Sequence, residues 1–463
     1  FNQSMTNQFD WNFRQVFGDT CPVEQVQEPD IISSLKFSND GMYLAAGDKG
    51  GRIIVFQRKL DPIQPVEYEF YTEFQAHSQG FDPMRSANIS EKVVQIQWLP
   101  KIGNSLFLLT CNERIIKVWR VQNKVVTQVS NTNDLKNRRL TDASQLKVPR
   151  IVKQQDIQPS CSARRVFENV SQYNVNSISI SPEHDRFLIA DDLKISIWDV
   201  NSSADAMEIV NLKPPKMDEA CEVITYASYS PTQSSQFVYG TSSGVVVLGD
   251  TRVSPLIKNG RLFIPGLQSS SELPYQAFAQ ISQQSDIAAG ICSVQLCKQQ
   301  NTLLSRDFLA ARLWDIRMET RPLHIVPLHP QAREYASRFL ESDAIFDRFE
   351  VAFSPDGKSF VTGSYTDRFN IYSLKNSQLF GFNVQATRQV KRRSRTVQQY
   401  LNGKPSPSPN VGALGVWDNK LNLENLQMDP FEMRRKIQFL DWHPTENVLA
   451  VATVSNLYVY ASQ

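Results

Sequence analysis

The sequence predicts an all-β fold, a seven-bladed β-propeller with a protruding β-hairpin arm. Three observations predict it: a two-strand unit that recurs seven times, a turn signal inside the units, and a strand-like segment before the first unit that can close a ring. A unit of two apolar strands cannot bury its apolar face alone, so the copies must stack on one another. For all-β repeats, a propeller is the stacking that leaves only short and protected edges.

The recurring unit is an apolar strand, a turn and a second apolar strand. The turns are rich in glycine, asparagine and aspartate, as in residues 39–41 and 355–357, and such turns join the strands of β-hairpins. Ser-Pro and His-Pro steps before several turns favour an extended backbone there. The first strand of each unit carries one large apolar anchor: Phe37, Trp98, Ile180, Tyr229, Leu296, Phe353 and Trp442.

The segment 9–17 alternates apolar and polar residues and precedes the first unit. We expect it to add an outer strand to the last unit, whose final strand ends at Tyr460 near the end of the chain. Joining the two ends of the chain in one sheet hides both sheet edges. Residues 1–463 therefore form a single propeller domain.

Two long connections interrupt the repeat. The connection from Trp119 to Ile178 is about twice as long as the one from Trp198 to Ala227. Apolar residues lead out of the repeat and back into it around a polar, basic stretch at 131–139, which predicts a β-hairpin arm at about 121–158. The apolar arm residues that we expect to bind a partner are Val125, Val126, Val129, Leu146 and Val148.

The second long connection follows Tyr372. It contains a basic run at 391–395 and a Pro-Ser alternation at 405–409. This composition predicts an extended, mobile loop at about 375–430. The basic run is typical of a solvated loop, and a nuclear signal or a partner patch is the alternative.

The composition predicts an intracellular protein without a cofactor. The formal net charge is +2, which indicates neither a nucleic-acid partner nor a membrane surface. The six cysteines form no C-x-x-C pair, which favours reduced thiols, and the five histidines show no metal-binding spacing. No signal peptide is recognisable, and no apolar run approaches the roughly 20 residues of a membrane span. We expect the cytoplasm or the nucleus as its location.

The motifs of catalysis are missing from the sequence. It contains no G-x-S-x-G motif, no P-loop and no Rossmann glycine pattern followed by a helix. The glycine-rich stretch at 47–52 lies between two expected strands, so it indicates a tight turn rather than a phosphate-binding loop. We therefore expect no catalytic residues and no enzymatic activity.

Seven stretches go beyond a generic propeller. They are residues 47–52, 72–77, 190–195, 222–225, 345–350, 362–365 and 442–444. Together they closely resemble the WD-repeat regulatory B-type family of protein phosphatase 2A, the fifty-five-kilodalton family, and the match runs from about Trp11 to Tyr460.

The resemblance implies a non-catalytic subunit that joins a helical-repeat scaffold subunit to a catalytic phosphatase subunit and selects phosphoprotein substrates. It also implies that the arm grips the scaffold and that one face of the disc carries a substrate groove. The positions that match the family's substrate contacts are Glu28, Lys49, Glu91, Lys92, Asp192, Asp218, Glu219, Val223, Asp343 and Phe346.

The residue types suit such a groove. Carboxylates in expected loops or strand ends can form an acidic surface, which attracts the basic residues that flank a phosphosite or belong to a short helical motif. Val223 and Phe346 can supply apolar anchor points for an amphipathic helix. We expect the carboxylates to come from Asp191, Asp192, Asp218, Glu219, Glu222, Asp343 and Asp347.

Two other functions stay open, a generic propeller adaptor in another intracellular complex and a propeller hydrolase. The sequence also departs from the family at four positions, which bear on substrate preference. These are Ala220 in place of leucine, Asn174 in place of histidine, Ser90 in place of glutamate and Pro83 in place of tyrosine.

Overall fold

The computed structural model describes most of the chain. The described residues are 11–18, 22–59, 66–82, 86–129, 148, 151–168, 170–202, 206–214, 216, 222–253, 260–263, 287–329, 336–375, 378–386, 397–400 and 433–462.

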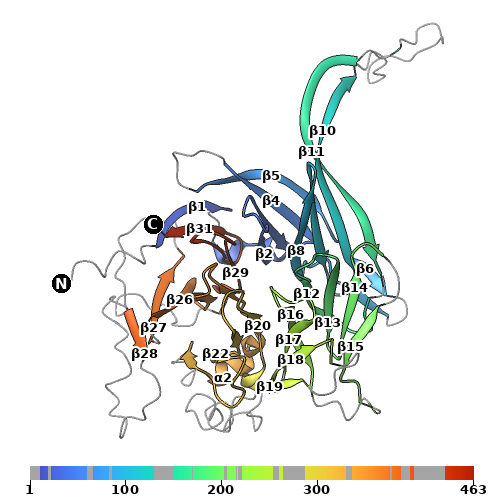
Figure 1. Cartoon of the computed structure of the whole chain (residues 1–463). Helices are drawn as coiled ribbons and strands as arrows, with labels where there is room; N and C mark the ends of the chain where they lie inside the picture. The colour runs from blue at the N-terminus through green and yellow to red at the C-terminus, as the bar shows by residue number, and fades with distance from the viewer. Residues whose placement is uncertain are drawn as a thin grey trace.

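Seven antiparallel sheets, here called blades 1 to 7, stand around a common centre in the described part of the chain (Figure 1). Each blade has four strands from the centre outward, and blade 6 has a fifth. Blade 1 is β2 (Ile32–Phe37), β3 (Tyr43–Asp48), β4 (Arg52–Arg58) and β5 (Tyr68–Gln75); blade 2 is β8 (Gln95–Ile102), β9 (Ser105–Cys111), β10 (Ile116–Val129) and β11 (Ile151–Phe167); blade 3 is β12 (Val175–Ile180), β13 (Arg186–Asp191), β14 (Lys194–Asp199) and β15 (Met207–Asn211).

The remaining blades follow in chain order. Blade 4 is β16 (Ile224–Tyr229), β17 (Gln236–Thr241), β18 (Val246–Asp250) and β19 (Arg261–Phe263); blade 5 is β20 (Ser293–Leu296), β21 (Thr302–Arg306), β22 (Ala310–Asp315) and β23 (His324–Pro327); blade 6 is β24 (Val351–Phe353), β25 (Ser359–Gly363), β26 (Arg368–Lys375), β27 (Gln378–Gln385) and β28 (Val397–Tyr400); blade 7 is β29 (Phe439–Trp442), β30 (Val448–Ala452), β31 (Leu457–Ser462) and β1 (Trp11–Phe17).

Short elements lie between the blades. They are a two-stranded ribbon of β6 (Gly80–Asp82) and β7 (Ala87–Ile89), the helix α2 (Ala336–Glu341), and the 3₁₀ turns η1 (Val23–Gln25), η2 (Glu28–Asp30), η5 (Ile287–Ala289) and η6 (Ala344–Phe346). None of the helices in these residues is long and apolar enough to cross a lipid bilayer.

The ring closes through the N-terminal strand, as the sequence predicts. β1 pairs with β31 in antiparallel register, so the two ends of the chain share blade 7. Trp11 packs edge-on against Trp442 with ring centroids 5.4 Å apart. The side-chain amide of Gln15 exchanges two hydrogen bonds with the backbone of Tyr68, which fastens blade 7 to blade 1. The predicted seven-bladed propeller is therefore confirmed.

The core lies between neighbouring blades rather than inside any one of them. One cluster, for example, joins Leu35 and Phe56 of blade 1 to Val448 and Val459 of blade 7. A buried side chain of this kind stabilises the fold by about 1.5–3 kcal/mol. The predicted anchor residues are confirmed as part of the innermost strands. Because each blade covers the apolar face of the next, no blade is stable by itself.

The antiparallel order gives the ring two distinct faces. The innermost strands all begin on one face, and the turns between the second and third strands lie on that face too. We call it the loop face. The turns between the third and fourth strands lie on the opposite face, which we call the arm face.

The arm is an extension of β10 and β11. β9 pairs with β10 only as far as Gln122, and from Asn123 to Val129 β10 pairs with β11 alone. Figure 1 shows this hairpin leaving the disc. Neighbouring strands of a blade run in opposite directions, so the turn between the third and fourth strands lies on the arm face. The arm joins β10 to β11, the third and fourth strands of blade 2, and therefore leaves the disc on that face. Leu146, on the returning half of the predicted arm, lies outside the described residues.

The predicted mobile loop at 375–430 is wrong in its first part. β27 (Gln378–Gln385) pairs with β26 along its whole length, and β28 (Val397–Tyr400) pairs with β27. The physical reason is that blade 6 needs an outer strand to cover its third strand, as every other blade has. Residues 387–396 and 401–432 lie outside the described residues.

Candidate docking surface

Every described residue that the sequence assigns to substrate binding lies on the loop face. Each belongs either to a segment that leads to an innermost strand or to a turn between second and third strands. These residues are Glu28, Lys49, Glu91, Lys92, Asp192, Val223, Asp343 and Phe346. Asp218 and Glu219 lie outside the described residues.

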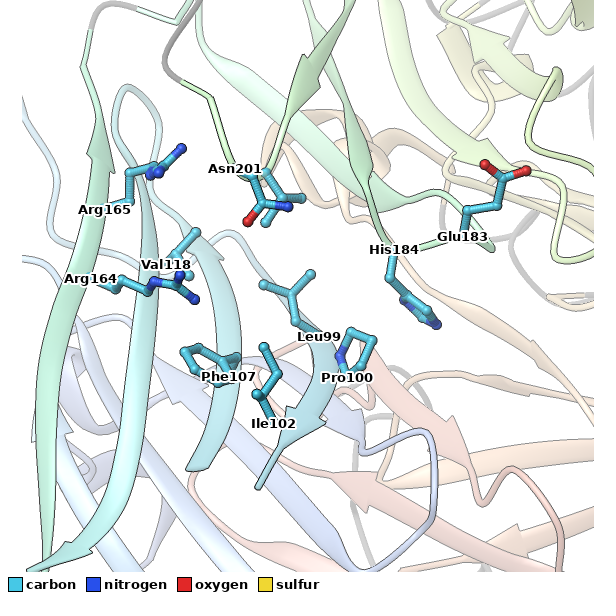
Figure 2. A pocket seen from close by; sticks show the side chains of 11 residues that line it. Leu99, Pro100, Ile102, Phe107, Val118, Arg164, Arg165, Glu183, His184 and Asn201 are labelled. Carbon is cyan, nitrogen blue, oxygen red and sulfur yellow. The ribbon is translucent and has the colours of Figure 1, made fainter. Parts of the chain in front are cut away.

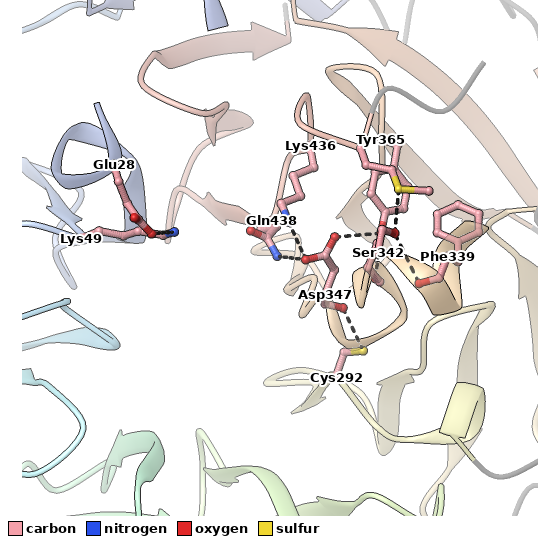
Figure 3. Close-up of polar contacts among 11 residues, drawn as sticks. Glu28, Lys49, Cys292, Phe339, Ser342, Asp347, Tyr365, Lys436 and Gln438 are labelled. Atoms are coloured by element: carbon pink, nitrogen blue, oxygen red, sulfur yellow. Dashed lines mark hydrogen bonds and ion pairs between the residues drawn. The ribbon is translucent and has the colours of Figure 1, made fainter. Parts of the chain in front are cut away.

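Glu28 and Lys49 form a pair within blade 1. Glu28 opens η2, and Lys49 lies in the turn between β3 and β4. The ammonium of Lys49 lies 3.0 Å from the carboxylate of Glu28, as Figure 3 shows. The Glu28 side chain is largely exposed, so water screens this pair and it contributes little to stability. It therefore presents one positive and one negative group to solvent.

Lys92 leads to β8 of blade 2, next to Glu91. Burial lowers the pKa of Lys92, and the nearby charge of Lys49 lowers it further. The charge of Glu113 opposes this shift, whereas Arg348 and Lys436, which precede the innermost strands of blades 6 and 7, add to it. Basic groups from three other blades therefore act on Lys92, so the loop face is not uniformly acidic in its described part.

Asp192 and Val223 are neighbours at the border of blades 3 and 4. The backbone N–H of Ile224 donates to the carbonyl of Asp192 at 2.8 Å. The amide of Asn176 donates to the Asp192 carboxylate and to the carbonyl of Ile224, both at 2.8 Å. Val223 is 37% exposed beside them. An apolar side chain and a carboxylate are thus fixed side by side.

Arg348 reaches this border from across the ring. Its guanidinium donates to the side-chain oxygen of Asn176 at 3.1 Å, and it also approaches the carbonyl of Thr225. Arg348 precedes β24 of blade 6, and blades 3 and 6 are not neighbours in the ring. Arg348, Asn176 and Lys436 were not predicted from the sequence, although each lies at or just before the start of an innermost strand, and that position is the signal that could have identified them.

Phe346 is displayed on a rigid base. It ends η6, where Ala344 and Ile345 are buried while Phe346 is 65% exposed. Asp343 starts the turn with a left-handed backbone, φ 55°, which costs energy for a residue with a side chain. Beneath η6 lies an aromatic cluster, whose members include Phe308, Phe339, Phe349 and Tyr365.

Asp347 is neutralised by its neighbours. Lys436 donates to its carboxylate at 2.5 Å, and the hydroxyl of Tyr365 donates at 2.9 Å, as drawn in Figure 3. The thiol of Cys292 also approaches its backbone carbonyl. Asp347 therefore anchors η6 and does not offer a free negative charge.

Asp191 does not belong to the docking surface, and its inclusion among the acidic surface residues is wrong. It is buried, and its carboxylate accepts from the backbone N–H groups of Leu193 and Lys194 and from the hydroxyl of Ser171. Equivalent turns use an acid or amide in the same way, as Asn112 does in blade 2. The reason is structural: the side chain supplies acceptors that the tight turn leaves missing.

The arm presents apolar side chains on the opposite face. Val125 of β10 and Ile157 of β11 stand directly opposite each other, and they are 60% and 68% exposed. Val148 is 86% exposed. Val126 and Val129 lie in β10. Apolar side chains paired across a free hairpin suit a protein contact better than water.

Comparison with known proteins agrees with this architecture. Residues 22–57, which include blade 1 up to β4, match the family model described as WD domain, G-beta repeat. The chain is 34% identical to the B regulatory subunit of protein phosphatase PP2A from Schizosaccharomyces pombe, over 97% of each chain. It is also 34% identical to the serine/threonine-protein phosphatase 2A regulatory subunit sur-6 of Caenorhabditis elegans, over 98% of this chain and 91% of that protein.

The likeness covers the arm and all seven blades, since it extends over nearly the full length of both relatives. Identity of this level and extent shows a shared family and not merely a shared fold. The chain belongs to the B-type family of regulatory subunits of protein phosphatase 2A.

Proposed function

We propose that this regulatory subunit docks phosphoprotein substrates on its loop face while its arm binds a helical-repeat scaffold subunit. The scaffold in turn holds the catalytic phosphatase subunit. Docking a substrate beside the catalytic subunit raises its effective concentration and needs no catalytic group in this chain. The proposed location is the cytoplasm, with the nucleus as a second site.

One observation carries the proposal most directly: those predicted substrate residues that the structure describes share one face, and the arm leaves from the other. A subunit with this division can bind two partners at once without competition between them. The exposed Val223 and Phe346 offer apolar anchors, and Asp192 and Asp343 offer charge. These groups suit a short amphipathic helix or a segment with basic residues around the phosphosite.

The test separates docking from assembly. We expect Asp192→Lys to weaken capture of a basic phosphopeptide about tenfold, since it replaces attraction by repulsion, while the trimer with scaffold and catalytic subunits still forms. The Kd of the peptide for the reconstituted trimer and size-exclusion chromatography measure the two properties. Glu67→Lys, in blade 1 before β5, is a matched control of the same charge change.

The arm is tested by the converse variant. We expect Val125→Asp with Ile157→Asp to reduce scaffold binding at least tenfold, because two carboxylates would be desolvated in the contact. Peptide capture by the isolated chain should stay unchanged. Loss of assembly in Asp192→Lys, or loss of peptide capture in the arm variant, contradicts the division of roles.

A further inference from the structure

A cavity of about 170 Å³ lies on the arm face between blades 2 and 3 (Figure 2). Its floor is apolar and consists of the buried side chains Leu99, Phe107, Val118 and Val200, which belong to the core cluster between these blades. The exposed Ile102 extends the apolar wall. The polar residues around it are Arg164, Arg165, Glu183, His184 and Asn201.

A β-bulge brings the two arginines to the same cavity. Successive side chains of a regular strand point to opposite faces, so neighbours in sequence do not line one pocket. In β11, however, Arg165 pairs with Val118 and Ala163 with Trp119, which leaves Arg164 as the extra residue. A bulge of this kind re-aims side chains. Figure 2 shows Arg164 and Arg165 both beside the cavity.

The same bulge in neighbouring blades carries no charge. In blade 1 the extra residue is Tyr71, followed by Thr72, and in blade 3 it is Ile209, followed by Val210. The fold therefore does not require arginine at this position. The two arginines are therefore a feature of blade 2 and not of the bulge itself.

Neither arginine forms an ion pair within the described part of the chain. The guanidinium of Arg164 lies over the ring of Phe107, 5.3 Å from its centroid. Nη1 of Arg165 is buried and has no hydrogen-bond partner among the described residues. A buried donor without a partner destabilises the folded chain, so a bound acceptor would relieve this cost.

The other titratable groups do not cancel this charge. The carboxylate of Glu183 accepts from the hydroxyl of Ser234 at 2.9 Å, toward blade 4. Burial lowers the pKa of His184, which keeps its ring neutral at physiological pH. Two positive groups thus flank an apolar cavity, and the carboxylate of Glu183, although charged, forms no ion pair with them within the described residues and instead contacts Ser234.

We propose that this cavity binds an acidic peptide segment of a partner protein. An apolar side chain of the segment enters the cavity, and a neighbouring carboxylate pairs with Arg164 and Arg165. A cavity of about 150 Å³ can hold a benzene-sized group, so one aromatic or leucine side chain fits. Guanidinium groups bind carboxylates through paired hydrogen bonds. The proposal does not rest on substrate docking, because it concerns the opposite face.

Fluorescence anisotropy with the purified full chain tests the chemistry. The probe is a labelled peptide Ser-Gly-Phe-Asp-Glu-Gly-Ser, and its neutral counterpart is Ser-Gly-Phe-Asn-Gln-Gly-Ser. We expect the acidic peptide to bind at least tenfold more tightly and to weaken as salt rises. Equal binding of the two peptides would overturn the proposal.

Variants locate the site. Arg164→Gln and Arg165→Gln should each weaken the acidic peptide at least fivefold, whereas Arg321→Gln, on the arm face of blade 5, should change it less than twofold. An equal loss in all three would mean non-specific attraction and would overturn the proposal. If Arg165→Gln does not fold, the binding affinity of the Arg164→Gln variant alone tests the proposal, because Arg164 is exposed.

A second variant tests the apolar half of the site. Val200→Phe fills the cavity and leaves both arginines in place. We expect it to weaken the phenylalanine peptide at least fivefold but to leave a Ser-Gly-Ala-Asp-Glu-Gly-Ser peptide within twofold. Unchanged binding of the phenylalanine peptide would show that the cavity is not used.

Discussion

The loop face presents its side chains in two different ways. At the border of blades 3 and 4, hydrogen bonds from Asn176 and the backbone of Ile224 hold Asp192. At blade 6, packing holds Phe346, because the residues before it are buried over an aromatic cluster. We call these the polar side and the aromatic side. The difference teaches that the side chains of one surface can be held in place by single hydrogen bonds at one point and by a small apolar core at another.

The largest effect is expected on the aromatic side. Phe339 is fully buried, with ring centroids 5.3 Å from Phe308 and 5.5 Å from Tyr365. Phe339→Ala should lower the free energy of unfolding by about 3–5 kcal/mol, because it leaves a cavity under η6. Urea unfolding followed by tryptophan fluorescence measures the change.

The matched control is Phe346→Ala, which truncates the exposed ring of the same side. It should change stability by no more than about 0.5 kcal/mol while weakening peptide capture. If both variants destabilise the chain equally, Phe346 is part of the core and the aromatic side is not a display platform.

A smaller effect is expected for Asp192 of the polar side and for the buried Asp191 next to it in sequence. Asp191→Ala leaves the N–H groups of Leu193 and Lys194 without their acceptor, which should cost about 2–3 kcal/mol. Asp192→Ala removes a half-buried group with one side-chain donor and should cost about 1 kcal/mol or less. Thermal unfolding of both variants is the measurement. A larger loss for Asp192 would reverse their assigned roles.

The fold could be predicted from the sequence because its signals are local and repeated. Each anchor such as Phe37 or Trp442 lies in an apolar strand, and seven copies support one another. The closing strand β1 could be predicted as well. The alternation of apolar and polar residues in 9–17 indicates a β-strand, and a strand must pair with another strand. The outer strand β27 was missed because basic and proline-rich residues farther along dominated the composition of the whole connection.

The candidate site could be predicted only in part. Placement on one face follows from topology, so residues such as Lys49 and Phe346 come to the same side. The distinction between Asp191 and Asp192 does not follow, because burial depends on which carboxylate turns toward the backbone. The contact of Arg348 with Asn176 joins residues 172 positions apart, and no local pattern encodes such a distance.

Glu350, directly before β24 of blade 6, should give the stability of the chain a pH dependence. Burial raises the pKa of Glu350 to about 8; Lys36 opposes this shift and Asp441 adds to it. The folded state therefore holds a proton that the unfolded state releases above its ordinary pKa, so stability falls as pH rises toward 8. Glu350→Gln should flatten this dependence and stabilise the chain by roughly 1–2 kcal/mol at pH 8. Melting temperatures from pH 5 to 8.5 measure it, and a slope equal to that of the parent chain would contradict the assignment.

The smallest effect is expected for the bond that joins the two sides. Arg348 is exposed, and its 3.1 Å hydrogen bond to Asn176 is open to water. Arg348→Gln should therefore change stability by about 0.5 kcal/mol or less.

A double-mutant cycle with Asn176→Ala isolates the pair. We expect a coupling energy of about 0.5 kcal/mol in unfolding, because the two side chains share one solvated contact. The same cycle measured on peptide capture should give a larger coupling, since a peptide lying over the contact excludes water and strengthens it. Equal coupling in the two measurements would mean that no ligand covers the centre of the loop face, and the polar and aromatic sides would then act as separate sites.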